Sequence, residues 1–377
     1  MAKTPAYWDY LKLNSLLSLQ DGLGPDEDDV IADELHFIVV HQVYELWFKL
    51  IIRSLRLAVR EFDTPKVAEE AVPYVVHHLR RVNVTLQLAV EQFRLMETLT
   101  PQDFMRFRTK LTPSSGFQSH QMRVMEILMG LEESKRIRYG NVDPLDHIRE
   151  RAHTSDAAKL AWAEINKARG EKSLLQVLNE WLYRTPIQGS RWDSDTDDEA
   201  VTAFLNDYLE RANARNDDML SQLVAALGEE RRAGLEARFE GSAAQSRAFL
   251  FAQDLKEDTT DEERKRVRRV RAALLFIESY RTLPLLAWPR TLLDVVVEME
   301  EQLLLWRNRH ARAVERIIGR RVGTGGSSGV DYLDKTRSYR VFTDLWAIRA
   351  VLLPQEALPP LEDPDMYGFA RVWSVDP

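Results

Sequence analysis

Hydrophobic residues in this chain recur at alternating steps of three and four positions, the spacing of one face of an α-helix. Three long segments show the pattern most clearly, at 33–62, 75–96 and 291–318. The row in the third segment is Val296, Met299, Leu303, Trp306, His310, Ala313 and Ile317. No long stretch alternates apolar and polar residues, so the pattern gives no sign of strands. We therefore expect an all-α fold.

Shorter helices are expected between and after these segments. Thr100-Pro101 predicts a helix start, because proline suits the first helical position. Further helices are predicted from Phe117 to about Leu131 and over 341–353. Residues 132–290 are helical but weakly patterned, and we interpret them as a helical elaboration within one domain spanning 1–377. The charged runs at 193–200 and 262–271 are expected to be a solvated loop and a charged helix face.

Composition narrows the classes of function. The chain has 377 residues, of which 45% are hydrophobic and 29% charged, and this length allows a substantial core. It has no cysteine, which excludes disulfides and thiolate metal sites. A net charge of −8 without a dominant basic face argues against nucleic acid as a partner. No apolar run is long enough to span a membrane, and we expect a cytoplasmic protein without membrane association.

Two of the eight histidines, His41 and His310, lie within strongly apolar helical rows. The commoner explanation for each alone is a core histidine that hydrogen-bonds the backbone. The alternative is a haem site, since imidazole is a suitable iron ligand and apolar walls can hold the macrocycle. His41 would then face the open side of the iron. The chain has no HExxH motif, so a zinc site is not expected.

Two further features are ambiguous from residue type. Arg108 follows Phe104 and Phe107 on an apolar helix, and a partly buried arginine needs an anion. That anion is either a protein carboxylate or the carboxylate of a substrate. The glycine-rich stretch 319–329 lacks the lysine of a P-loop and follows a helix. It is either a flexible linker or a lid over a pocket near His310, with Thr324 supplying a hydroxyl.

Six segments, in order along the chain, together resemble the tryptophan 2,3-dioxygenase family. They are YWDYLKLNSLLSLQ (7–20), DELHFIVVHQVYELWFKLII (33–52), METLTPQDFMRFR (96–108), LTPSSGFQSHQMR (111–123), WRNRH (306–310) and IIGRRVGTGGSSGVDYL (317–333). The resemblance covers nearly the whole chain. It implies an all-helical haem b enzyme of the homotetrameric kind, which opens the indole ring of L-tryptophan with O₂ to give N-formylkynurenine.

The resemblance also implies roles for individual residues. His310 matches the proximal iron ligand, with Trp306 and Gly116 beside the haem, and His41 matches the catalytic histidine that hydrogen-bonds the indole N–H. The implied substrate-binding residues are Phe37, His41, Phe104, Arg108, Ser115, Met122 and Thr324. Tyr7, Tyr10 and Leu11 match residues that a neighbouring subunit contributes to the pocket. Arg108 is the implied partner of the substrate carboxylate.

The chain departs from the family pattern near the expected pocket. Met122 stands where an aromatic residue is usual, and Val40 and His120 are also uncommon at their positions. These departures leave open a second function, haem-dependent mono-oxygenation of a modified tryptophan, such as a methylated one, in secondary metabolism. A third alternative is a haem-binding sensor or helical scaffold without catalysis, against which the retained Arg108 and Thr324 argue.

Overall fold

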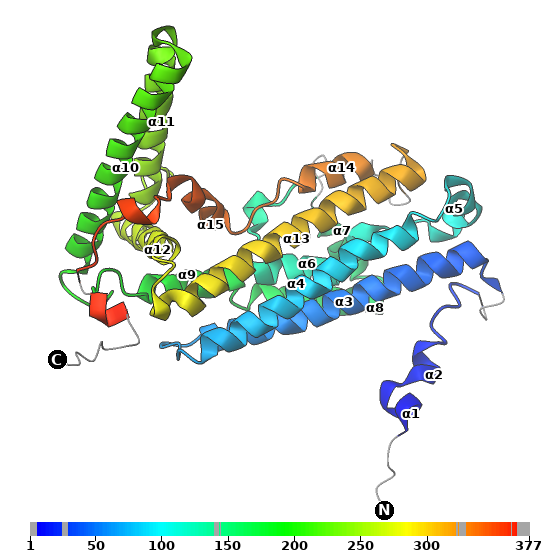
Figure 1. Cartoon of the computed structure of the whole chain (residues 1–377). Coiled ribbons are helices and arrows are strands. Elements are labelled where there is room, and N and C mark those ends of the chain that lie inside the picture. The colour runs from blue at the N-terminus through cyan, green and yellow to red at the C-terminus, as the bar shows by residue number, and fades with distance from the viewer. Residues whose placement is uncertain are drawn as a thin grey trace, which may run out of the picture. The chain divides into compact units, whose positions relative to one another are not determined.

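The computed structural model describes residues 6–24, 29–138, 143, 145–321, 323, 329–362 and 364–367. The α-helices are α1 (Tyr7–Leu11), α2 (Leu13–Leu16), α3 (Ala32–Phe62), α4 (Ala71–Met96), α5 (Pro101–Phe107), α6 (His120–Met129), α7 (Asp146–Arg151), α8 (Asp156–Arg169), α9 (Leu174–Arg184), α10 (Asp197–Leu227), α11 (Arg232–Leu250), α12 (Asp261–Ser279), α13 (Ala287–Ile318), α14 (Gly329–Thr336) and α15 (Thr343–Ala347). Short 3-10 turns join several of them, and one isolated bridge, Ile187–Ser190, is the only β pairing within these ranges. The all-α prediction is confirmed (Figure 1).

The chain divides into two compact units. Unit 1 comprises Met1–Ala58, His78–Ser173 and Glu298–Val341, and unit 2 comprises Val59–His77, Leu174–Val297 and Phe342–Pro377. The weakly patterned segment 132–290 is therefore shared between them, because its first part belongs to unit 1.

Unit 1 is built on its parts of α3, α4 and α13, which lie side by side (Figure 1). The Tyr44 hydroxyl of α3 donates to the Ala89 carbonyl of α4 at 3.1 Å, and its ring meets Trp306 of α13 edge-on. Gln92 of α4 accepts from the Trp47 indole and donates to the Val40 carbonyl of α3. These contacts fix the three helices against one another around the predicted apolar rows.

The predicted row on α13 is confirmed. Its six apolar members are at most 8% exposed, whereas His310 keeps part of its surface accessible. On length and composition alone, α3 would also meet the requirement for crossing a membrane, a test that the core helix of a soluble protein passes too. Ile51 and Leu55 of α3 are fully buried in unit 1, as expected of a core helix.

Capping sets where the short helices near the site begin. Thr100 accepts from the Asp103 N–H, and Pro101 occupies the first position of α5, as predicted. The helix expected from Phe117 to Leu131 is shorter, because residues 116–118 form a 3-10 turn and Ser119 caps α6. Gly130, with φ at 117°, ends α6.

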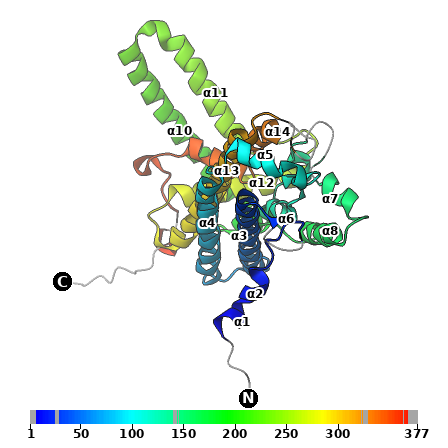
Figure 2. The same cartoon turned by 90° about the vertical axis from the view of Figure 1, so that its right-hand side faces the viewer.

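Unit 2 contains α9 to α12, among which α10 and α11 form a long antiparallel pair (Figures 1 and 2). The predictions of a solvated loop at 193–200 and of a charged helix face at 262–271 are wrong in part, because α10 already begins at Asp197 and some of the charged residues are buried. Asp197 and Arg269 are both buried and form a two-pronged ion pair. The helix predicted over 341–353 is also shorter: α15 covers Thr343–Ala347 and then tightens into a 3-10 turn that ends before Pro354.

Candidate active site

A cavity of about 300 Å³ lies in unit 1 between α3, α4, α6, α13 and α14. Its predicted lining residues are Phe37, His41, Phe104, Arg108, Ser115, Gly116, Met122, Trp306 and His310. Residues that are far apart in the sequence therefore meet at one site. Tyr7, Tyr10 and Leu11 do not line this cavity and are 70%, 77% and 43% exposed. Thr324 lies outside the described residues, and Gly323 lines the cavity.

His310 presents a neutral imidazole to the cavity. Its ring packs against Trp306 at 5.0 Å and stacks on Phe93 at 5.8 Å between centroids. Burial, together with the positive charge of nearby Arg307 and Arg123, lowers its pKa to about 3. Neither ring nitrogen is hydrogen-bonded to another residue of the described chain. The neutral imidazole therefore has one nitrogen whose lone pair is free to bind a metal, next to the aromatic rings of Trp306 and Phe93.

His41 supplies a second neutral imidazole from α3. Its Nδ1 lies 2.8 Å from the Phe37 carbonyl oxygen. Because a carbonyl only accepts, Nδ1 carries the proton, and Nε2 is left as an acceptor. Burial lowers the pKa of His41, although the ring is accessible from the cavity. A ligand N–H in the cavity therefore has an acceptor at Nε2.

An aromatic wall stands beside His41. The Phe37 ring lies 3.9 Å from the His41 ring, 6.0 Å from Phe104 and 5.6 Å from Phe107. Phe104 and Phe107 meet edge to face. Such a wall favours a flat apolar ligand over water.

Polar groups lie at other parts of the lining. Arg108, in the 3-10 turn after α5, faces the cavity half-buried, with Nη1 3.9 Å from the Met105 sulfur. The Ser115 hydroxyl accepts from the Phe117 N–H at 3.3 Å. A Cβ added to Gly116 would have no atom within 4 Å, so the backbone there borders open space. Met122 is buried at the cavity wall.

These residues fit a haem. The donor set offers one neutral imidazole at His310, a suitable axial ligand for iron, and the described residues include no cluster of metal-ligating side chains that would hold a bare ion. Flat aromatic walls and the open backbone at Gly116 leave room for a planar group. The Trp306 indole N–H beside His310 is buried without a partner in the described chain.

Several residues of the lining were not predicted. Arg123 and Arg307 line the cavity and are both buried, and Tyr332 of α14 lines it with a buried hydroxyl that has no partner in the described chain. Arg307 follows Trp306, a member of the predicted row, and Arg123 is the last residue of the family-like segment 111–123. These positions in the sequence could have indicated a place near the cavity, but arginine as a residue type predicts an exposed side chain.

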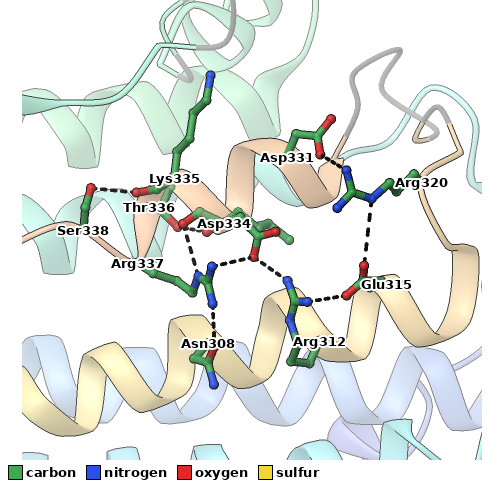
Figure 3. Close-up of polar contacts among 11 residues, drawn as sticks. Asn308, Arg312, Glu315, Arg320, Asp331, Asp334, Lys335, Thr336, Arg337 and Ser338 are labelled. Carbon is green, nitrogen blue, oxygen red and sulfur yellow. Dashed lines mark hydrogen bonds and ion pairs between the residues drawn. The ribbon is translucent and has the colours of Figure 1, made fainter.

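An exposed ion-pair network joins the end of α13 to α14, which also lines the cavity (Figure 3). Arg312 pairs with Glu315 on its own helix and with Asp334 of α14. Arg337 contacts Asp334 at 3.3 Å, and Arg320 contacts Asp331 at 3.3 Å. The network links α14 to the end of α13 on the solvent side, and Tyr332, Leu333 and Thr336 of α14 line the cavity.

Comparison with known proteins identifies relatives over almost the full chain. The sequence model of the family described as tryptophan 2,3-dioxygenase matches residues 1–352. A tryptophan 2,3-dioxygenase of Sorangium cellulosum is 45% identical, over 98% of this chain and 88% of that protein. Tryptophan 2,3-dioxygenase 2 of Ralstonia nicotianae is 45% identical, over 98% and 99%. A tryptophan 2,3-dioxygenase-like protein of Xanthomonas campestris is 45% identical, over 72% and 98%.

Proposed function

Because this chain belongs to the tryptophan 2,3-dioxygenase family, a family of oxidoreductases, we propose that it uses haem b and O₂ to cleave the C2=C3 bond of the indole ring of L-tryptophan. The product is N-formylkynurenine, which retains both oxygen atoms and so requires no external reductant. The observation that carries the proposal is the pair of neutral imidazoles from α3 and α13 in one aromatic cavity that also contains Arg108.

Each residue has a role that follows from its chemistry. His310 would hold the iron through its unprotonated nitrogen, and the bound haem supplies the activation of dioxygen. His41 accepts the indole N–H at Nε2, because its Nδ1–H is committed to the Phe37 carbonyl. Phe37 and Phe104 flank the ring and exclude water. Holding the indole in one orientation lowers the barrier without a strong base.

Arg108 binds the substrate carboxylate through its guanidinium fork. Its position on the cavity lining supports the substrate carboxylate as its anion, the alternative to a protein carboxylate. Thr324 remains a predicted partner of the amino-acid end, on the resemblance alone. Met122 closes the wall where relatives carry an aromatic residue, and Ser115 lies on the same lining.

The proposal includes a cytoplasmic homotetramer in which Tyr7, Tyr10 and Leu11 of one copy complete the pocket of another. The exposure of all three side chains supports it, since such apolar surface is stabilised by a partner. Leu46 of α3 and Leu88 of α4 are also about half exposed.

The test is an absorption spectrum of the haem-loaded protein with and without L-tryptophan, followed by turnover under ¹⁸O₂. We expect a Soret band that shifts on adding L-tryptophan, and a product containing two labelled oxygen atoms. His310→Ala is expected to abolish stable haem binding. A single labelled atom would instead support mono-oxygenation, and a spectrum that does not respond to L-tryptophan would support a sensor.

A further inference from the structure

Positive charge exceeds negative charge in one buried cluster beside the cavity. Glu126 of α6, with 1% of its side chain exposed, is paired with three guanidinium groups. Its Oε2 lies 2.9 Å from Arg123 Nη1 and 2.5 Å from Arg136 Nη1, and its Oε1 lies 2.6 Å from Arg307 Nη2. The three arginine side chains are at most 7% exposed. One carboxylate therefore faces three buried cations.

Glu126 is ionised in this cluster. Burial alone would raise the pKa of its carboxyl, but the three guanidinium groups outweigh burial and lower it to about 2. Glu300, which is buried and lines a small cavity together with Glu126 and Arg307, is the next acid to consider. Even with Glu300 counted, the buried groups retain an excess of one positive charge. Water cannot screen such an excess as it does on the surface.

Other buried arginines of the described chain are matched with carboxylates. In unit 2, Arg269 and Asp197 form a one-to-one ion pair, and Arg271 pairs with both Asp254 and Asp344. The Glu126 cluster differs from both. The Nε atoms of all three arginines, and Nη2 of Arg136, are also buried without a hydrogen-bond partner in the described chain.

The excess is directed toward the cavity. Arg123 and Arg307 both line it, whereas Arg136 does not. Among the described residues of the lining, Glu45, which accepts a hydrogen bond from Gln121, is the one acid. Arg307 precedes His310 by three residues on α13, so the two side chains project from the same side of that helix.

We propose that Arg123 and Arg307 form the site for the carboxylates of the haem, with Glu126 holding both arginines in place. The proposal rests on the proposed function, because it assumes that His310 binds haem iron. The excess is two positive charges without Glu300 and one with it, so the two carboxylates of haem b are sufficient to offset it in either case. L-Tryptophan is a poorer match, because its ammonium cancels its single carboxylate and Arg108 already faces the cavity from another element.

The experiment is a titration of the full-length apoprotein with haemin and, separately, with haemin dimethyl ester, in which both carboxylates are capped. Soret absorbance measures binding of each, without reference to activity. Wild-type protein is expected to bind haemin at least roughly tenfold more tightly than the ester, about 1.4 kcal/mol. Arg307→Met is expected to remove most of this preference, since it lowers affinity for haemin and leaves affinity for the ester unchanged.

Two variants serve as controls. Arg309 lies two positions after Arg307 on α13, is half-exposed and pairs with Glu97. Arg309→Met should therefore keep the wild-type preference for haemin over the ester. Arg307→Lys retains the positive charge and should keep part of the preference for haemin over the ester. Circular dichroism of each apoprotein verifies folding, and Arg123→Met replaces Arg307→Met if the latter does not fold.

Equal binding of haemin and its ester by the wild type would overturn the proposal without any variant. The proposal would also be overturned if Arg307→Met weakened the binding of haemin and of its ester by the same factor. The same holds if the substitution weakened only the binding of L-tryptophan. A failure of the proposed function looks different, because neither haemin nor its ester would then give a Soret band that depends on His310.

Discussion

Two networks of arginine and carboxylate groups share helix α13 and differ in charge balance. The exposed network in Figure 3 has three arginines, at 312, 320 and 337, and three acids, at 315, 331 and 334. The buried cluster has three arginines around Glu126. The solvated network could tolerate an imbalance and is balanced. The buried one cannot be screened by water and is unbalanced, which indicates that a ligand supplies the missing negative charge.

Burial also decides how much each network contributes to stability. Exposed ion pairs contribute little, because water and salt screen them. A buried carboxylate among guanidinium groups behaves differently, because removing it leaves buried positive charges without their ion-pair partner. The comparison can therefore be tested with matched substitutions of one acid from each network.

The largest effect is expected for Glu126→Gln, which keeps the shape of the side chain and removes its charge. We expect the free energy of unfolding of the apoprotein to fall by about 3–5 kcal/mol, as for breaking a buried ion pair. Urea denaturation measures it. The matched variant is Glu315→Gln in the exposed network, for which a change below about 1 kcal/mol is expected. Similar losses in the two variants would break the distinction between the networks.

The next effect concerns pH. The pKa of Glu126 lies at about 2 in the folded protein, below its ordinary value of 4.5, because of its three arginine partners. A lowered pKa contributes stability above pH 4.5, which is lost as the pH falls toward 2. The shift corresponds to a contribution on the order of 3 kcal/mol. The difference in unfolding free energy between wild type and Glu126→Gln should therefore narrow between pH 4.5 and 2. A difference that stays constant over this range would contradict it.

Sequence periodicity predicted the three long helices α3, α4 and α13, but not the bounds of the helices within 132–290. The row containing His310 lies where the spacing placed it, because a helix buries one face at regular intervals. The same spacing could not distinguish a core histidine from a ligand. That distinction needed His41, Phe104 and Arg108 on the same cavity, which only tertiary structure or family resemblance provides.

The buried charges could not be predicted for a related reason. Arg123 and Glu126 are three residues apart on α6, which from sequence suggests an ordinary surface pair. The other two members of the cluster, Arg136 and Arg307, lie 10 and 181 residues from Glu126 in the sequence. For the same reason the sequence predicted a solvated loop around Asp197 and a charged helix face around Arg269, although the two are a buried pair in unit 2. Residue type predicts average exposure, whereas the partner that makes burial tolerable is set by packing between elements.

The smallest effect is expected for Asp334→Asn, which removes the acid that Arg312 and Arg337 share. Its side chain is 24% exposed, against 1% for Glu126, so screening by water and salt should limit the loss of stability to about 1 kcal/mol or less. The loss should shrink further in 1 M salt, where the Debye length is about 3 Å. Urea denaturation at low and high salt measures both.

Asp331→Asn is the control on the same helix, because Asp331 is more exposed and pairs with Arg320 at 3.3 Å. Asp334→Asn should exceed it slightly, since Asp334 is shared by two arginines. Haem affinity should not change in either variant, because neither acid lines the cavity. A loss of haem affinity on Asp334→Asn would instead mean that the exposed network positions the Tyr332 face of α14 against the ligand. The two networks would then both act on the haem site, and they would differ only in how far their side chains are buried.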